Sequence, residues 1–197
     1  KGADAVATYP VTETIHEAEI LRASVSPART DDGTRKRARE VAVDVLEFLD
    51  GWGVYGIELF ETEAGEILVN EIAPRPHNSG HWTIEGARTS QFENHIRAVL
   101  GWPLGPTDLS EPTVSANILG DVDEPEDATL YNVDRVLDTH NAHLHWYGKK
   151  QARPLRKMGH ITVTDPDGDD ETDLDATTLL DRTESLRDGL TFVDESQ

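Results

Sequence analysis

Residues 54–72 contain two stretches in which apolar and polar side chains alternate, separated by Glu63-Ala64-Gly65. Alternation of this kind predicts strands, and a short loop that contains glycine predicts that they pair as an antiparallel hairpin. The predicted pairing brings Glu58, in the first strand, close to Glu71, near the end of the second. If both side chains lie on one face, their like charges repel and each carboxylate needs a cation nearby.

The hard carboxylate oxygens of Glu58 and Glu71 favour Mg²⁺ or Mn²⁺ over zinc as that cation. In phosphoryl transfer such an ion neutralises the charge on phosphate oxygens. The alternative is that one or both residues are ordinary solvent-facing glutamates of a hairpin. The spacing of the two residues leaves both interpretations open.

Hydrophobic periodicity predicts further strands and helices along the chain. Asp31 or Asp32 is expected to cap one helix, while Ser90 with Glu93 forms a predicted capping box that opens another. The expected strands are 3–10, 18–25, 54–62, 66–72, 113–119, 144–146 and 160–164, and the expected helices are 31–50, 90–100 and 174–190.

The composition of the chain disfavours several classes of protein. With 38 acidic against 18 basic residues the net charge is −20, which opposes binding to nucleic acid. No apolar run approaches the roughly 20 residues of a membrane helix, and no signal peptide opens the chain. Cysteine is absent, so disulfides and thiolate metal sites are excluded. We therefore expect a cytoplasmic protein with no membrane or nucleic-acid partner.

The basic residues include few lysines. Only five of the 18 are lysine, and 13 are arginine. A solvated acidic surface with little lysine is typical of proteins that work in concentrated salt, where screening reduces the repulsion between charges. We therefore hypothesise a halophilic source, and the alternative is an acidic protein from a mesophile.

Residues 139–164 contain no acidic residue, and we call them the acid-free segment. The segment holds the cationic residues Lys149, Lys150, Arg153, Arg156 and Lys157 together with His140, His143, His145 and His160. Local positive charge in so acidic a chain predicts a binding site for an anion.

Residues 165–197, in contrast, carry twelve acids and two arginines. The aspartate-rich stretch 165–170 resembles a calcium-binding loop, but no glutamate stands at the closing position. We therefore favour a solvated turn before the last helix.

The loop that follows the hairpin is rigid and rich in hydrogen-bond donors. Pro74 and Pro76 hold the backbone extended on either side of Arg75, an arrangement that suits a phosphate or carboxylate. His77 and His81 have the i, i+4 spacing of a zinc-binding pair, but the prolines and a glycine argue against the helix that such a pair requires. Hydrogen bonding within the loop is the alternative role for either histidine.

Two long segments resemble one known family. Residues 56–101, with NEIAPRPHNSGHWTIEGARTSQFENHIRAVLG, closely resemble the carboxyaminoimidazole ribonucleotide synthases, which are ATP-grasp enzymes. Residues 145–160, HWYGKKQARPLRKMGH, are similar to a second signature of that family, with Leu155 where the family has glycine. The leucine in place of glycine puts in question whether the turn at that position has the same shape as in the family.

The resemblance implies a role for each matching residue. Tyr9-Pro10 followed by His16 is similar to a third family segment, in which Thr14 replaces the usual asparagine, and His16 would contact ATP. The resemblance further implies that Glu58 and Glu71 bind the metal (Mg²⁺ or Mn²⁺) and that Asn70 and Glu71 bind the ATP phosphates. Catalysis around carboxyphosphate and the imidazole substrate would involve Arg75, His77 and Asn78. Substrate binding would involve Lys149, Arg156 and Arg75.

The resemblance also implies a fold and an activity. The expected fold is α+β, with residues 1–106 as the second part of an ATP-grasp domain (antiparallel sheet with helices) that carries the metal and ATP phosphate site. Residues 107–197 would form a small β-rich C-terminal domain with the ribonucleotide phosphate-binding segment 145–160. The implied reaction is the ATP- and bicarbonate-dependent carboxylation of aminoimidazole ribonucleotide to carboxyaminoimidazole ribonucleotide, through carboxyphosphate, in purine biosynthesis.

Enzymes of this family are about twice as long as this chain. We therefore expect the chain to be a C-terminal half that is inactive without an N-terminal half, and a homodimer is one expected assembly. Two alternatives stay open: another ATP-grasp carboxylase or ligase, and a non-catalytic acidic module that binds nucleotides.

Overall fold

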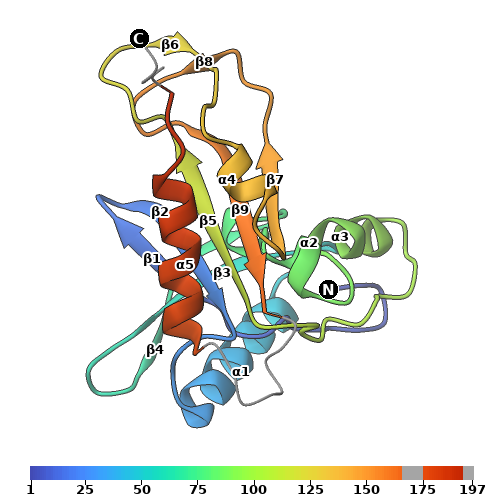
Figure 1. Cartoon of the computed structure of the whole chain (residues 1–197). Coiled ribbons are helices and arrows are strands. Elements are labelled where there is room, and N and C mark those ends of the chain that lie inside the picture. The colour runs from blue at the N-terminus through green and yellow to red at the C-terminus, as the bar shows by residue number, and fades with distance from the viewer. Residues whose placement is uncertain (166–174, 193–197) are drawn as a thin grey trace. The chain divides into compact units, whose positions relative to one another are not determined.

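The computed structural model describes residues 1–165 and 175–192, and the chain divides into two compact units (Figure 1). The first unit comprises residues 1–13 and 26–110, and the second comprises residues 14–25 and 111–197. The change at residues 110–111 lies near the boundary expected at 106–107. Residues 14–25 differ from that expectation because they pair with strands of the second unit and so belong to it.

The first unit combines helices with a two-stranded antiparallel sheet. Its elements are α1 (Asp32–Phe48), β3 (Gly56–Glu61), β4 (Ile67–Ala73), the short 3₁₀ helix η1 (Asn78–Gly80), α2 (Thr83–Gly86) and α3 (Gln91–Val99). The helix α1 packs against both strands of the hairpin.

The helix α1 forms where the sequence predicts it, with Asp31 as its cap. The hydroxyl and the backbone N–H of Thr34 donate hydrogen bonds to the Asp31 carboxylate, at 2.7 and 3.1 Å, and these bonds lower its pKa. At the other end, the ammonium of Lys1 donates to the carbonyl oxygens of Leu46 and Leu49, at 2.9 and 2.7 Å. A cation at this end also complements the helix dipole.

The helix α3 begins and ends as its sequence signals predict. The hydroxyl of Ser90 accepts a hydrogen bond from the N–H of Glu93 at 3.2 Å. Gly101 follows the helix with φ +70°, and the N–H of Trp102 returns to the carbonyl of Arg97 at 2.8 Å, which closes the last turn. The Glu93 carboxylate forms an ion pair with Arg97 at 2.6 Å.

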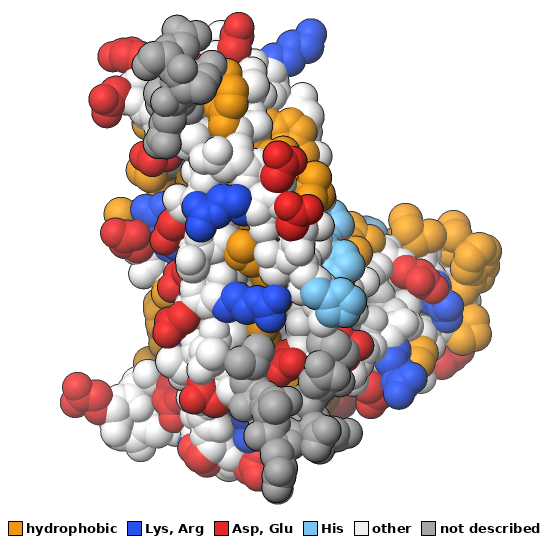
Figure 2. Space-filling model, in the orientation of Figure 1, with side chains coloured by type: hydrophobic (Ala, Val, Ile, Leu, Met, Phe, Trp, Pro, Cys, Tyr) orange, Lys and Arg blue, Asp and Glu red, His pale blue; other side chains and the backbone are white. Residues whose placement is uncertain are grey.

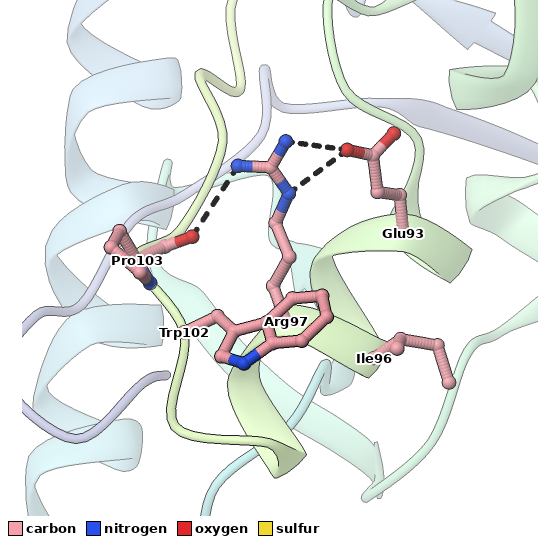
Figure 3. A pocket seen from close by; sticks show the side chains of 5 residues that line it. All are labelled: Glu93, Ile96, Arg97, Trp102 and Pro103. Atoms are coloured by element: carbon pink, nitrogen blue, oxygen red, sulfur yellow. Dashed lines mark hydrogen bonds and ion pairs between the residues drawn. The ribbon is translucent and has the colours of Figure 1, made fainter.

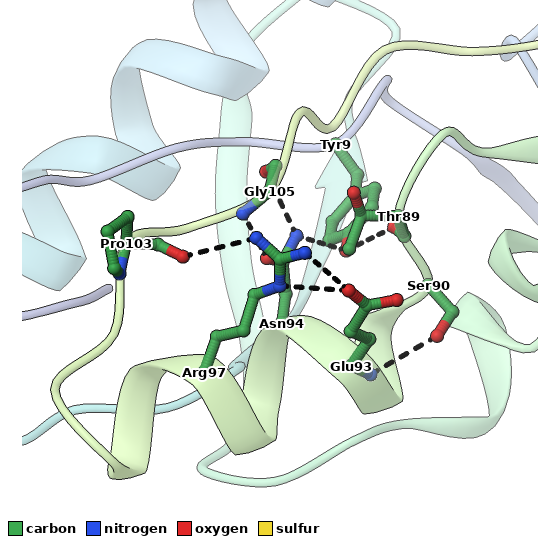
Figure 4. Close-up of polar contacts among 8 residues, drawn as sticks. All are labelled: Tyr9, Thr89, Ser90, Glu93, Asn94, Arg97, Pro103 and Gly105. Atoms are coloured by element: carbon green, nitrogen blue, oxygen red, sulfur yellow. Dashed lines mark hydrogen bonds and ion pairs between the residues drawn. The ribbon is translucent and has the colours of Figure 1, made fainter.

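Residues 3–10 do not form a strand, so that expectation is wrong. Pro10 offers no N–H to a ladder, and the segment is held instead by the side chain of Tyr9 (Figure 4). The Tyr9 hydroxyl donates to the carbonyl of Thr89 and accepts from the amide of Asn94, both at 2.8 Å. Asn94 in turn accepts the N–H of Gly105 at 2.8 Å. Burial raises the pKa of Tyr9 to about 12.

The second unit is built on a five-stranded sheet in the order β1-β2-β5-β9-β7 (Figure 1). Its elements are β1 (Glu13–Glu17), β2 (Ile20–Ser26), β5 (Thr113–Leu119), β6 (Glu126–Asp127), α4 (Asp134–Leu137), β7 (Ala142–Trp146), β8 (Gln151–Ala152), β9 (Lys157–Thr164) and α5 (Ala176–Asp188). The helix α5 lies along the sheet, and β6 pairs with β8 in a separate short ladder.

The core of the second unit joins the sheet to its helices. Val114 and Ile161 project from β5 and β9, while Val136 from α4 and Leu179 from α5 pack into the same cluster. All four side chains are at most 1% exposed. The expected strands 113–119, 144–146 and 160–164 are confirmed within β5, β7 and β9, and α5 confirms residues 176–188 of the expected helix 174–190. The calcium-loop resemblance at 165–170 lies almost entirely outside the described residues.

The residues of β1 were expected to be extended but not to form a strand of the sheet. The turn between β1 and β2 consists of Ala18 and Glu19, with φ of +50° and +64°. Two consecutive residues of positive φ make the tight hairpin turn that Asn-Gly or Gly-Gly pairs usually form. Because neither residue is a turn signal, the first strand of this hairpin is hidden in the sequence.

Acidic side chains are scattered over the visible face rather than gathered at one place (Figure 2). Within residues 1–165 and 175–192, the structure contains no helix with the length and apolar character needed to cross a bilayer.

Candidate functional site

The hairpin of β3 and β4 places Glu58 directly opposite Glu71, and the sequence predicts that the two residues lie close together on adjacent strands. Directly opposite residues of an antiparallel pair project to the same face. The register then shifts by one residue, because Leu59 pairs with Val69 and leaves Asn70 as an extra residue in β4. Adjacent residues of a strand normally project to opposite faces, and this β-bulge explains why the side chains of Asn70 and Glu71 both lie on the face of Glu58.

Four side chains meet on this face, and we call them the hairpin site: Glu58, Asn70, Glu71 and His77. The Asn70 amide Nδ2 donates to Glu58 Oε2 at 3.3 Å, and His77 Nε2 lies 3.9 Å from Glu58 Oε1. His77 follows the hairpin in the chain, and its other ring nitrogen, Nδ1, lies 2.9 Å from the hydroxyl of Ser79. Asn70 and His77, two of the predicted site residues, therefore lie beside the carboxylate of Glu58.

The donor set of the hairpin site fits a hard divalent ion. Among the residues that the structure describes, no three His, Cys, Asp or Glu side chains are grouped to hold a metal by themselves. Mg²⁺ is usually held by one or two carboxylates together with substrate phosphates and water, and Glu58 with Glu71 supplies that number. His77 faces Glu58, whereas the ring of His81 lies 5.8 Å from that of Phe92, so these two histidines have different neighbours.

The proline-flanked loop carries the other two predicted catalytic residues. Arg75 is exposed, and its Nη1 donates to the carbonyl of Pro76 at 3.1 Å. Asn78 opens η1, and its Nδ2 is buried without a hydrogen-bond partner among the described residues. A buried donor without a partner costs free energy, about 1–3 kcal/mol. A ligand with an acceptor oxygen would satisfy it.

The acid-free segment brings Lys149 and Arg156 together in the second unit. The Lys149 ammonium donates to the carbonyl of Lys157 and lies 5.6 Å above the ring of Tyr147. Burial lowers the pKa of Lys149, and the nearby charges of Arg156 and Lys157 lower it further. The positive charges of these three side chains repel one another, and a bound anion would relieve that repulsion.

Tyr147 links Lys149 to the sheet. Its hydroxyl lies 2.8 Å from Nδ1 of His160, which is 2% exposed on β9. The ring of His160 stacks on that of His145 at a centroid distance of 4.4 Å. Burial raises the pKa of Tyr147 to about 12.

A tight turn sets the position of Arg156. The N–H of Arg156 donates to the carbonyl of Arg153 at 3.0 Å, with Pro154 and Leu155 between them. Proline in the second position and φ of +59° at Leu155 in the third define a type II turn, which favours glycine in the third position. Gly120 packs against this turn, where a side chain would collide with the carbonyl of Arg153.

Replacement of Leu155 by glycine should stabilise the chain. Leucine is strained at φ +59°, and its side chain is 46% exposed, so little packing is lost. We expect Leu155→Gly to raise the free energy of unfolding by about 0.5–1 kcal/mol in urea titrations. Leu155→Ala is the control, because alanine keeps the strain and should give no gain. If both substitutions changed the free energy of unfolding equally, the turn at Leu155 would not be strained.

His16 lies on β1 with an exposed side chain, and it belongs to the second unit. The other predicted ATP-binding residues, Asn70 and Glu71, belong to the first unit. The structure therefore does not bring these three residues together within one unit.

A shallow pocket of about 310 Å³ opens beside α3 (Figure 3). Its lining consists of Glu93, Ile96, Arg97, Trp102 and Pro103. None of the predicted site residues lines this pocket, so it is separate from the hairpin site and from the acid-free segment.

Comparison with known proteins divides the chain in a similar place. Residues 1–92 match the model of the ATP-grasp domain, and residues 113–173 match that of the phosphoribosylaminoimidazole carboxylase C-terminal domain. The expected α+β fold, an ATP-grasp part followed by a carboxylase C-terminal domain, is therefore confirmed.

The relatives that this chain matches are longer than the chain. The N5-carboxyaminoimidazole ribonucleotide synthase of Bacillus subtilis is 47% identical over 157 residues, which are 80% of this chain and 40% of that protein. The crystal structure of the corresponding synthetase from Thermotoga maritima superposes with a TM-score of 0.81 at 45% identity, over 93% of this chain and 47% of the other. The chain thus spans about half the length of these relatives or less.

A third comparison includes bound ligands. The N5-carboxyaminoimidazole synthase of Aspergillus clavatus, solved in complex with ADP and 5-aminoimidazole ribonucleotide, is 37% identical with a TM-score of 0.81. The match covers 95% of this chain and 49% of the Aspergillus chain.

The sequence analysis missed two residues beside the predicted sites. Tyr147 was overlooked because a tyrosine beside basic residues is a weak signal. Gln91 has no signal in the sequence, and only the structure shows that α3 buries the polar residues Gln91 and Asn94 while the apolar Phe92 and Ile96 on the same helix are exposed. A helix that buries amides and exposes apolar side chains reverses the usual pattern.

Proposed function

We propose that the chain contributes to the ATP- and bicarbonate-dependent carboxylation of aminoimidazole ribonucleotide, as the C-terminal half of a carboxyaminoimidazole ribonucleotide synthase. The proposal rests on one observation: each of the two matching segments carries a site suited to this reaction. The first unit carries paired carboxylates beside a donor-rich loop, and the second carries a basic turn. Relatives at 37–47% identity bear the synthase name, and one of them was solved with ADP and the ribonucleotide.

The reaction needs two steps that suit the residues of the first unit. An oxygen of bicarbonate attacks the γ-phosphorus of ATP, which breaks the bond to ADP and forms carboxyphosphate. The amine of the ribonucleotide then attacks the carboxyl carbon, and inorganic phosphate leaves. Arg75 and the Asn78 amide would donate hydrogen bonds to the carboxyphosphate oxygens, and His77 would hold the reacting groups beside Glu58. A magnesium ion held by Glu58 and Glu71 would neutralise charge on the ATP phosphates.

The second unit would hold the ribonucleotide through its phosphate. Lys149 and Arg156 supply two cations whose charges repel in the absence of an anion. Arginine suits a phosphate because its planar guanidinium donates two parallel hydrogen bonds, and lysine adds a point charge.

A chimaera tests the proposed activity. In the B. subtilis synthase, this chain would replace the 40% of the protein that it matches. We expect release of ADP that requires both bicarbonate and aminoimidazole ribonucleotide. A folded chimaera that binds both nucleotides without turnover would contradict the proposed chemistry. Turnover with a different carboxylate or amine acceptor would favour another ATP-grasp ligase, and no nucleotide binding would favour a non-catalytic acidic module.

The acidic composition supports a halophilic source, and a melting experiment tests it. Because salt screens repulsion among the charges of a chain with net charge −20, the melting temperature should rise markedly between dilute buffer and molar potassium chloride. Equal melting temperatures in the two solvents would favour the mesophilic alternative. The cytoplasmic location and the homodimer stay predictions.

A further inference from the structure

The backbone of His77 is held on both sides by one buried side chain. The N–H of His77 donates to Oε1 of Gln91 at 2.8 Å, and Nε2 of Gln91 donates to the carbonyl of His77 at 2.7 Å. Gln91 is the first residue of α3 and only 2% exposed. Because the amide of Gln91 binds both the N–H and the carbonyl of His77, it fixes the position and the orientation of the backbone at this residue, as a neighbouring strand in a sheet would.

Gln91 is itself held firmly. Its backbone N–H donates to the hydroxyl of Thr83 at 3.0 Å, and that hydroxyl donates to the carbonyl of Gly80 at 2.6 Å. A Cβ atom at position 80 would lie 2.8 Å from Oε1 of Gln91, so the loop backbone passes close to the amide. The backbone of Gln91 is therefore joined to the loop at Gly80 through Thr83, while its side chain binds the loop at His77.

The strand β3 limits His77 from the opposite side. A Cβ atom at Gly56 would lie 2.6 Å from Cβ of His77, so only glycine allows this approach. Between the Gln91 amide and the bare backbone of Gly56, the histidine has little freedom to shift. Its imidazole Nε2 is thereby kept 3.9 Å from Oε1 of Glu58.

We propose that Gln91 is a positioning residue, which holds His77 against the hairpin site through the two backbone hydrogen bonds. The expected effect of Gln91 on turnover rests on the proposed function. The position of His77 in the free chain does not depend on that function, and it can be tested without any ligand.

The matched control lies on the same helix. Asn94 is 3% exposed and, like Gln91, makes several hydrogen bonds, but these join Tyr9 and Gly105 rather than His77. If Gln91 served only the general stability of α3, its loss and the loss of Asn94 would have the same effects at His77.

The test compares Gln91→Met with Asn94→Leu by NMR of the free chain. In Gln91→Met we expect exchange of the His77 amide hydrogen to be about ten-fold faster relative to neighbouring amides, since two hydrogen bonds are lost. The nuclear Overhauser contact between Gly56 and His77 should weaken, whereas Asn94→Leu should leave both signals unchanged. Unchanged His77 signals in Gln91→Met, or equal changes in both variants, would overturn the proposal.

A second variant decides the matter if Gln91→Met does not fold. Gln91→Glu keeps the acceptor for the His77 N–H and removes the donor to its carbonyl, and a negative charge is tolerated in the first turn of a helix. We expect the His77 amide to stay protected while its contact with Gly56 weakens. In the chimaera, either variant should lower kcat more than it raises KM for the ribonucleotide. If the chimaera has no turnover, the proposed function fails, but the NMR result still decides the role of Gln91.

Discussion

Arg156→Ala should weaken the binding of aminoimidazole ribonucleotide to this chain by about 10- to 100-fold, because charge-assisted hydrogen bonds are worth about 1.5–3 kcal/mol. Arg156 is the fourth residue of the type II turn, and its Nη1 donates to the carbonyl of Gln151 at 3.1 Å. That bond fixes the side chain and leaves most of its five donors for a phosphate. Calorimetric titration of the ribonucleotide into both proteins measures the difference.

Arg153→Ala is the control for this prediction. Arg153 belongs to the same turn, is exposed, and uses its Nη2 on the side chain of Gln151 at 3.2 Å. If the effect of Arg156 reflected only the general positive potential of the segment, the two substitutions would weaken binding equally. We expect a change of less than about three-fold for Arg153→Ala, which is typical of a screened surface charge.

Glu58→Gln should lower the affinity of the chain for Mn²⁺ by at least about 10-fold. Loss of even an outer partner of a metal site costs about 10- to 100-fold, and Glu58 is central to the hairpin site, with Asn70 at 3.3 Å and His77 at 3.9 Å. Titration followed by the electron paramagnetic resonance of free Mn²⁺ gives the dissociation constant. Glu71→Gln should have a similar effect.

The control and a second readout separate ligation from general charge. Glu63→Gln removes the same charge from the exposed turn of the same hairpin and should change Mn²⁺ affinity less than about two-fold. Without metal, Glu71→Gln should slightly stabilise the chain, by about 0.5 kcal/mol, since it removes a repulsive pair opposite Glu58. Equal Mn²⁺ affinities of the Glu58→Gln and Glu63→Gln variants would exclude Glu58 as a ligand.

Local signals in the sequence predict much of this fold because each acts through nearby atoms. Asp31 and Ser90 cap their helices through hydrogen bonds to residues three positions later, and Gly101 ends α3 with positive φ. The glycine-containing turn likewise predicts the hairpin that brings Glu58 and Glu71 onto neighbouring strands, whereas the bulge at Asn70 sets their direct pairing. The acid-free segment indicated a cationic cluster, and the structure does bring Lys149 and Arg156 together.

Features that depend on distant partners could not be predicted from such signals. The turn of Ala18 and Glu19 adopts positive φ without glycine or asparagine, so β1 was not expected as a strand. The extended stretch before Pro10 resembles a strand, but the side chain of Tyr9 binds Thr89 and Asn94, which are 80 and 85 residues away in the sequence. The bulge at Asn70 and the contact between Gln91 and His77 have no local signature, because each depends on how another segment packs.

Calorimetry on the unmodified chain tests the central claim most directly. The claim is that the acid-free segment holds the phosphate of a ribonucleotide, while the first unit supplies only part of an ATP site. Titration with aminoimidazole ribonucleotide should give saturable binding at one site per chain, and titration with Mg–ATP should give much weaker binding. No binding of the ribonucleotide to a chain whose circular dichroism shows it to be folded would contradict the claim.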